Sequence, residues 1–286
     1  MAKRLIVTAD DMGLSRATTD AIFEAFQHGI VTSASLIVNL PGADYAFERL
    51  RAEPGLDVGV HLNISGGLPV MLAKKIPSLV TSGGTFFPFE ILKRRLWRGS
   101  VSSKDIEAEF RAQIRKMKDQ GVTPTHANSH NHVHFHPLVA RAFTRALLSE
   151  GVTRARAPRH RHYPPNNLIG GAFRGPFYRR VPIAAYLDLL QVLAYGQVAH
   201  PDSCVVPSAK YRTKPELLEA GWRSVWENLP EGTYEFVVHP STDSVANPRA
   251  DDLPGRGKLE LRLLTDPASR EIINRHGIQL IPFSQL

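Results

Sequence analysis

The sequence predicts an α/β protein, a single β/α barrel or a close variant, because strand-like and helix-like segments alternate along it. Short apolar runs rich in β-branched residues are followed by longer segments whose apolar positions repeat at helical spacing. No internal repeat, low-complexity tract or linker divides the 286 residues. We therefore expect one domain over residues 1–286, with parallel strands in its sheet.

The first strand and helix are the clearest pair. Residues 5–9 form an apolar run that stops at two acids and a glycine, which is typical of a buried strand. Ser15 stands where a helix N-cap is expected, and apolar residues between positions 17 and 26 follow at helical spacing. The same order of strand, turn and helix is expected to recur.

The later elements repeat this pattern, with two interruptions. Further strands are expected at residues 34–38, 56–62, 125–129, 153–157, 234–238 and 278–281. Further helices are expected at residues 44–51, from a cap at Ser103 to Gly121, at 138–148, 183–195 and 215–228, and from Asp266 onward. Residues 63–102 and 158–180 are rich in glycine and proline, so they are expected to be long excursions over the functional face.

Composition excludes several classes of protein. Hydrophobic residues make up 43% and charged residues 22%, as in an ordinary globular chain. A single cysteine, Cys204, rules out a disulfide scaffold and a cysteine-rich zinc module. The formal net charge of +8 is compatible with an anionic partner, but no nucleic-acid-binding motif accompanies it. We predict no specific nucleic-acid partner, and peripheral contact with an anionic membrane surface stays open.

The N-terminus carries no recognisable targeting signal. A basic pair is followed by five mostly apolar residues and then two acids, which is too short for a signal peptide. No apolar run approaches the roughly 20 residues of a membrane span. We expect a cytoplasmic protein, in keeping with its one unpaired cysteine, and a homo-oligomer, as a dimer.

Titratable residues stand at the ends of four expected strands. They are Asp10 and Asp11, His61, His126 with His130, and His239. The C-terminal ends of parallel strands meet at one edge and carry the working residues of α/β folds. We therefore expect these side chains to share one rim.

The histidines are concentrated in one segment. Five of the twelve lie between His126 and His136. On an extended segment His130, His132 and His134 would point to the same side, so one could bind a metal while its neighbours bind substrate. The alternative interpretation of such a segment is a polar surface loop or a histidine-rich turn in the core.

Three of these residues suit a divalent metal ion. Asp11, His61 and His130 would supply two histidines and one carboxylate, with positions left open for water. The adjacent Asp10 could then act as general base, because one acid of a close pair can bind the ion while the other faces water. An aspartate pair before glycine is also an ordinary turn sequence. His239 follows a strong apolar run, which favours a catalytic role.

Four motifs, taken together, resemble one known family. They are Thr8-Ala9-Asp10-Asp11-Met12-Gly13, Val60-His61-Leu62-Asn63, Ser129-His130-Asn131-His132-Val133-His134 and Val238-His239-Pro240. The chain is similar, from residue 3 to about residue 245, to the YdjC-like carbohydrate deacetylases. That family includes chitooligosaccharide deacetylases and a branch associated with hopanoid biosynthesis. The combination of motifs is specific, whereas any one of them is not.

The resemblance implies a fold, a cofactor and a reaction. The fold would be a distorted TIM-like (β/α) barrel with long loops on the C-terminal face of its strands. One divalent ion, zinc or magnesium, would assist removal of an acetyl group from an N-acetylated sugar. By motif position Asp11, His61 and His130 would be metal ligands. Asp10 would be the base and His239 the acid.

Two positions depart from the family's pattern. Asn128 replaces the usual acid before Ser-His, and Met12 replaces the usual phenylalanine. Asn128 carries no charge, so any tuning of a ligand by an acid there is lost or replaced, and the change favours the hopanoid branch. The substrate is expected to be an oligosaccharide or glycolipid that contains N-acetylglucosamine. The expected substrate contacts are Asn63, His132, His134 and Arg156.

Two other functions remain compatible with the residues. Two histidines and a carboxylate also suit a non-haem iron oxygenase, although such enzymes usually place a histidine and the acid two residues apart on a jelly-roll strand. A non-enzymatic protein that binds an anionic polymer would use the basic and aromatic stretch 173–180.

Overall fold

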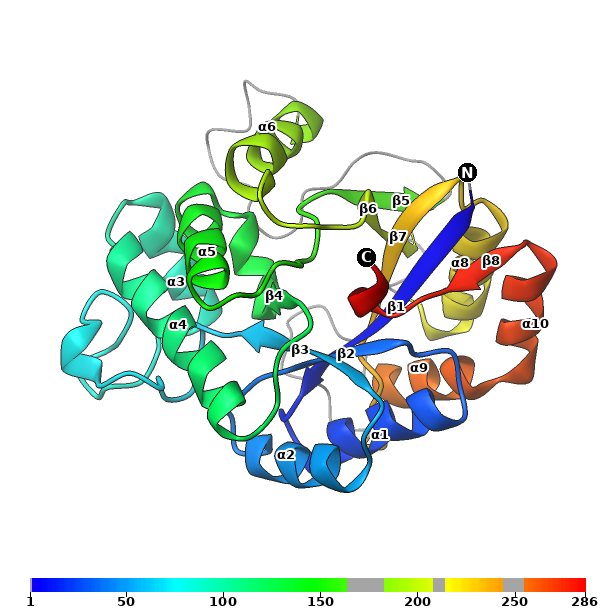
Figure 1. Ribbon diagram of the computed structural model, residues 1–286, viewed down its shortest axis with the longest axis horizontal. Helices are drawn as coiled ribbons and strands as arrows, with labels where there is room; N and C mark the ends of the chain where they lie inside the picture. The colour runs from blue at the N-terminus through cyan, green and yellow to red at the C-terminus, as the bar shows by residue number, and fades with distance from the viewer. Residues whose placement is uncertain (1, 164–182, 208–213, 244–254) are drawn as a thin grey trace.

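A curled sheet of parallel strands, with helices on its outer side, forms the framework of the protein (Figure 1). The computed structural model describes residues 2–163, 183–207, 214–243 and 255–286. Most of the expected excursion at 158–180, including the basic stretch 173–180, lies outside these residues.

The sheet contains eight strands among the described residues, and all pairings between these strands are parallel. Their order is β4 (Ala127–Ser129), β3 (Asp57–Leu62), β2 (Ser33–Leu36), β1 (Lys3–Met12), β7 (Gly232–Val238), β6 (Ser203–Pro207) and β5 (His160–Tyr163). β8 (Ile278–Leu280) pairs with the first residues of β1. The sheet forms a half-barrel, which confirms the α/β part of the predicted fold and not the closure of a complete (β/α)8 ring.

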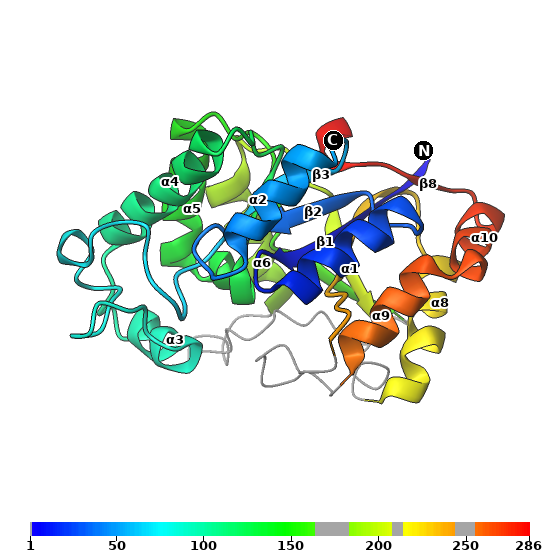
Figure 2. The same cartoon turned by 90° about the horizontal axis from the view of Figure 1, so that it is seen from below.

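The helices lie outside the curve of the sheet, as Figure 2 shows from a second side. They are α1 (Arg16–Gln27), α2 (Ala43–Ala52), α3 (Phe89–Trp97), α4 (Ser103–Asp119), α5 (Pro137–Ser149), α6 (Ile183–Tyr195), α8 (Leu218–Glu227), α9 (Arg256–Thr265) and α10 (Pro267–Arg275). α1 packs against β1, α4 against β3 and α8 against β6. Of the helices within the described residues, none is both long and apolar enough to cross a membrane.

Helix caps follow the chemistry that the sequence predicts, with one shift. The Ser15 hydroxyl accepts a hydrogen bond from the Thr18 amide at the start of α1. Ser102, and not Ser103, caps α4, because its hydroxyl accepts from the Asp105 amide. The expected cap was therefore one residue late.

The predicted strand at 153–157 does not form. Its β pairings among the described residues are single bridges, from Ala155 to Ala127 and from Arg154 to Ala199, which are too few for a continuous ladder on either side. The strand β5 begins only at His160. β6 and α9 were not expected from the sequence.

The helix α3 forms inside the expected excursion 63–102. Leu92 and Leu96 are four residues apart and buried, and the basic run 93–95 lies between them. The apolar spacing therefore decides the local structure, while the run of charges had suggested a loop.

Residues 281–286 cover the N-terminal end of the sheet, and Figure 1 shows the C-terminus within the curve of the strands. The Ile281 amide donates to the Leu5 carbonyl, and the Phe283 amide donates to the Ser33 hydroxyl. Phe283 is fully buried. This arrangement leaves the opposite edge, where the strands end, for the site.

Candidate active site

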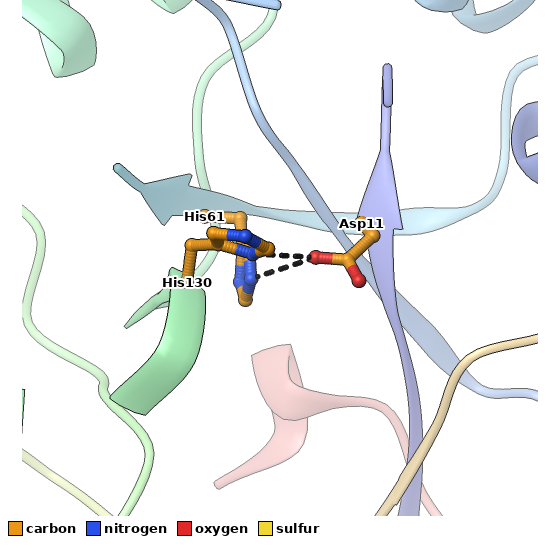
Figure 3. Close-up of side chains that lie close together, drawn as sticks. All are labelled: Asp11, His61 and His130. Atoms are coloured by element: carbon orange, nitrogen blue, oxygen red, sulfur yellow. Dashed lines mark hydrogen bonds and ion pairs between the residues drawn. The ribbon is translucent and has the colours of Figure 1, made fainter. Parts of the chain in front are cut away.

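Three predicted metal ligands meet at the C-terminal edge of the sheet (Figure 3). Asp11 lies near the end of β1, His61 lies on β3, and His130 follows β4 directly. Each offers one ligand atom, and these atoms all lie within 4.8 Å of one another. Asp11 Oδ1 is 3.2 Å from His61 Nε2 and 3.0 Å from His130 Nδ1. The sequence had predicted this convergence.

A break in the strand lets both acids reach the site. Neighbouring side chains of a regular strand point to opposite faces. The pairing of β1 with β2 shifts register between Ala9 and Met12, and Asp11 has a left-handed backbone with φ of 68°. Aspartate tolerates this conformation better than most residues. Asp10 and Asp11 are consequently both fully buried beside the same histidine, His61.

Hydrogen bonds fix the orientation of His61. Asn128 Nδ2 donates to Asp10 Oδ1 at 3.1 Å, so the amide oxygen of Asn128 faces His61 Nδ1 at 2.5 Å. Because that oxygen only accepts, Nδ1 carries the hydrogen and Nε2 keeps its lone pair. Nε2 is buried and has no hydrogen-bond partner among the described residues. This is the state expected of a metal ligand, so the three residues fit a divalent ion.

The two oxygens of Asp10 have different surroundings. Oδ1 accepts hydrogen bonds from Ser35 Oγ at 2.8 Å, Asn128 Nδ2 at 3.1 Å and Arg156 Nη2 at 2.8 Å. Oδ2 accepts from Arg156 Nη1 at 2.7 Å and lies 3.8 Å from His239 Nε2. Oδ2 is therefore the less saturated oxygen of the carboxylate.

The charge of Asp10 is set by two opposing effects. Burial raises the pKa of this carboxyl, but the Arg156 guanidinium, through its charge and its hydrogen bonds, holds the pKa well below its usual range. Asp10 is accordingly ionised at neutral pH.

His239 stands at the end of β7 and is partly open to solvent. Its backbone amide donates to the buried carboxylate of Glu260 on α9. Burial raises the pKa of Glu260, but Arg256 and His239 outweigh it and lower the pKa. An ionised Glu260 therefore fixes the backbone that carries His239.

The histidine segment was predicted to be extended, but the structure shows that it is not. Residues His130–Phe135 form a short 3₁₀ segment, in which Asn131 and His132 have left-handed φ values of 54° and 52°. His134 is buried, and its Nδ1 forms a hydrogen bond with the Ser129 hydroxyl. Two left-handed residues thus replace the regular alternation of a strand.

His126 does not reach the rim. It precedes β4, and its ring stacks on Phe283 with centroids 4.0 Å apart, at the opposite end of the sheet. Burial lowers the pKa of His126 to about 4. The expectation that it joins the site is corrected, because the strand begins after it.

Three of the predicted substrate contacts, Asn63, His134 and Arg156, are buried and hydrogen-bonded within the protein. The Asn63 side chain accepts from the Ser65 amide, and its backbone amide donates to Gln113. Arg156 is fully buried and bonds to Asp10 and Glu235. Substrate contact by Asn63, His132, His134 and Arg156 stays a prediction.

Sequence reasoning missed three residues of this site, namely Ser35, Glu235 and Glu260. Glu235 did leave a signal, because a glutamate in the middle of the apolar run 234–238 is unusual for a buried strand. Ser35 and Glu260 left none, since each acts on a partner distant in sequence.

Comparison with known proteins assigns the chain to a family. The family model described as YdjC-like protein matches residues 4–275. The chain belongs to the YdjC-like family.

Several proteins with similar sequences are named as deacetylases of carbohydrates. A carbohydrate deacetylase of Halalkalibacterium halodurans is 40% identical over 46% of this chain and 54% of its own length. A chitooligosaccharide deacetylase of Serratia marcescens is 38% identical over 51% of this chain and 57% of its own. The chain thus matches about half the length of these two relatives. A carbohydrate deacetylase of Mus musculus is 30% identical over 99% of this chain and 94% of its own.

A solved structure shares the fold. A candidate cellobiose-phosphate cleavage protein of Enterococcus faecalis V583 superposes with a TM-score of 0.78. The two sequences are 24% identical, and the match covers 100% of this chain and 99% of the other. At that identity the likeness concerns the fold alone.

Proposed function

We propose that this chain is a metal-dependent carbohydrate deacetylase that removes acetyl groups from N-acetylated sugars. One observation carries the proposal: Asp11, His61 and His130, which could hold a metal ion, lie beside Asp10, whose Oδ1 is 4.0 Å from His61 Nδ1. The names of the relatives point to the same reaction. The parallel α/β sheet disfavours the oxygenase alternative, which would call for a jelly roll.

The three ligands would hold one divalent ion. A bound ion supplies Lewis-acid polarisation of the acetyl carbonyl and lowers the pKa of water in the site. Two imidazoles and one carboxylate favour zinc over magnesium, which prefers oxygen ligands. The Asn128 amide oxygen keeps His61 in the tautomer that presents Nε2.

Asp10 acts as general base in this proposal, and it does so through Oδ2. Oδ1 already receives three hydrogen bonds, whereas Oδ2 receives one from Arg156 and faces His239. As water attacks the acetyl carbon, its proton passes to Oδ2 of Asp10.

His239 acts as general acid. Its Nε2 gives a proton to the sugar nitrogen as the carbon–nitrogen bond breaks, so that acetate and an amino sugar leave. The short separation between Nε2 and Asp10 Oδ2, 3.8 Å, supports a shared reacting centre.

The proposed substrate is an oligosaccharide or glycolipid that contains N-acetylglucosamine, a hopanoid-linked one among the candidates. Asn63, His132 and His134 are proposed to contact it from the loops after β3 and β4. Arg156 is buried and paired with Asp10, so we propose that it acts on the substrate through Asp10.

Acetate release tests the proposal directly. Purified protein supplied with zinc should release acetate from at least one member of a panel of chitooligosaccharides and N-acetylglucosaminyl lipids. His61→Ala, which removes a ligand, and Asp10→Asn, which removes the base, should both abolish release. Acetate no higher than that of His61→Ala across the whole panel would refute the proposal.

The organisation of the whole protein is proposed from its sequence. We infer one domain over residues 1–286 that forms a homodimer in the cytoplasm, with peripheral membrane contact open to test. Light scattering tests the dimer, and sedimentation with anionic vesicles tests the contact.

A further inference from the structure

Arg156 is clamped between two carboxylates inside the sheet. Nη1 and Nη2 donate to the two oxygens of Asp10 at 2.7 and 2.8 Å. On the neighbouring edge, Nη2 donates to Glu235 Oε1 at 2.7 Å, and Nε lies 3.0 and 3.1 Å from Oε1 and Oε2 of Glu235. All three side chains are fully buried. The guanidinium thus has both donor edges occupied.

Burying the Glu235 carboxylate in this position costs free energy. It lies in the middle of β7, where its strand neighbours are Ile6 on β1 and Cys204 on β6. Arg156 alone would neutralise Asp10. Glu235 adds a second buried carboxylate, and Arg156 is the one cation with which it forms an ion pair among the described residues. Burying such a charge is unfavourable unless well-placed ion pairs and hydrogen bonds offset the loss of hydration.

The contacts of Glu235 orient the guanidinium of Arg156. A guanidinium is planar, so the direction of one donor edge fixes the direction of the other. The contacts of Glu235 with Nε and Nη2 hold the plane in which Nη1 and Nη2 point at Asp10. That plane in turn sets which way Asp10 Oδ2 faces.

The far oxygen of Glu235 is held as well. Cys204 Sγ lies 3.4 Å from Oε2 and donates to it. Burial raises the pKa of the Cys204 thiol well above its usual value, and the Glu235 carboxylate raises it further, so the thiol is a neutral donor. Glu235 is therefore held by Arg156 on one side and by Cys204 of β6 on the other.

We propose that Glu235 is a positioning residue for the deacetylation proposed above, acting through the guanidinium of Arg156 on the carboxylate of Asp10. The proposal rests on the proposed function, because Asp10 must be the base for its orientation to affect the rate. Glu235 does not touch the substrate or the reacting atoms.

A double-mutant cycle on kcat tests whether Glu235 acts through Arg156. Glu235→Gln keeps the shape but leaves one accepting oxygen, and Arg156→Lys keeps the charge but lacks both donor edges. Glu235→Gln should lower kcat by about 10- to 100-fold, as small misplacements of catalytic groups do. In the Arg156→Lys background the further loss should be less than about threefold.

Three outcomes of this cycle would overturn the proposal. The first is that Glu235→Gln lowers kcat by the same factor in the wild-type and the Arg156→Lys backgrounds. The second is that Glu235→Gln changes KM alone. The third is a kcat for Glu235→Gln equal to that of the wild type. Glu150→Gln is the matched control, since Glu150 pairs with Arg111 and Arg115 on the outer helices. Its kcat should equal that of the wild type.

A second readout does not depend on activity. Nitrogen-15 NMR should show the Nε–H signal of Arg156, identified by its loss in Arg156→Lys, in slow exchange with water. In Glu235→Gln exchange should be at least about tenfold faster, because a hydrogen bond to a charged group is weakened. Zinc affinity should stay within about threefold, since no metal ligand is changed.

The two readouts separate the two hypotheses. If the wild-type protein releases no acetate from any substrate, the proposed function fails while the NMR comparison still stands. If acetate is released but the Arg156 signal in Glu235→Gln matches the wild type, the role of Glu235 is refuted. Should Glu235→Gln fail to fold, Glu235→Asp, which retracts the carboxylate by one methylene, tests the same point with both readouts.

Discussion

Asn128 makes two hydrogen bonds that few side chains could make together. Its oxygen accepts from His61 Nδ1 and its nitrogen donates to Asp10 Oδ1. An aspartate there could accept from His61 but would place a second carboxylate beside Asp10. The neutral amide therefore orients His61, the proposed ligand, without placing a negative charge against Asp10, the proposed base.

Replacing Asn128 with leucine should weaken metal binding. His61 Nδ1 would lose its acceptor, and loss of such an outer partner typically lowers metal affinity by about 10- to 100-fold. Titration of metal-free protein with zinc in competition with a chelating dye measures the affinity. Asn228→Leu is the matched control, because that side chain lies at the exposed end of α8. Equal zinc affinity in Asn128→Leu and wild type would contradict the assigned role.

His126 should make stability depend on pH. Burial lowers its pKa from 6.5 to about 4, so the unfolded chain binds a proton between these values and the folded protein does not. This contribution to the free energy of unfolding is fully present above pH 6.5. It falls as pH drops toward 4, by at most about 3 kcal/mol.

The variant His126→Phe should remove this dependence. Phenylalanine can still stack on Phe283 but cannot titrate. Urea unfolding at several pH values should give a flatter profile between pH 6.5 and 4 than the wild type gives. Identical slopes would show that His126 does not titrate as described.

Among the elements, those with a clear apolar period could be predicted, and those held by distant partners could not. β1, α1, α4 and α5 follow from their own sequences. The segment 153–157 has a strand-like pattern but is shared between Ala127 and Ala199, which no local pattern reveals.

The site divides in the same way. Its motif residues could be predicted because strand ends meet at one edge of a parallel sheet. The contacts of Ser35, Glu235 and Glu260 could not be predicted from the sequence, because the order and register of the strands bring their partners close. The break at Asp11 that turns both acids inward is likewise a property of the pairing of β1 with β2.

Gly59 shows how one element constrains another. A Cβ at Gly59 on β3 would lie 2.6 Å from atoms of the His126 ring. Gly59→Ala should therefore lower the free energy of unfolding by about 1–3 kcal/mol, as overpacking does. Urea unfolding measures the loss, and His126→Ala in the same chain should relieve it. Gly83→Ala, with no such close contact, should stay within about 0.5 kcal/mol of wild type.

At the scale of the whole molecule, the two ends of the sheet have separate tasks. The C-terminal edge carries the proposed metal ligands and Asp10. The opposite end is closed by residues 281–286, which bond to β1 and β2. A change at the closed end should therefore alter stability more than metal binding.

Phe283→Ala tests this separation. Removing a fully buried phenylalanine should lower the free energy of unfolding by about 3–5 kcal/mol. Zinc affinity of the folded variant should equal that of the wild type. Ser284→Ala is the control, because the exposed Ser284 uses only its backbone amide to reach Asp57. A large loss of zinc affinity in Phe283→Ala would mean that the two ends are coupled.

The measurement that tests the central claim most directly is acetate release by metal-free protein as zinc is added. The substrate is the most active of the panel, and acetate is quantified against total zinc per chain. We expect no release without metal, a rise with added zinc, and saturation at one ion per chain. Release that is independent of zinc, or none at any ratio, would contradict a metal-dependent deacetylase built on Asp11, His61 and His130.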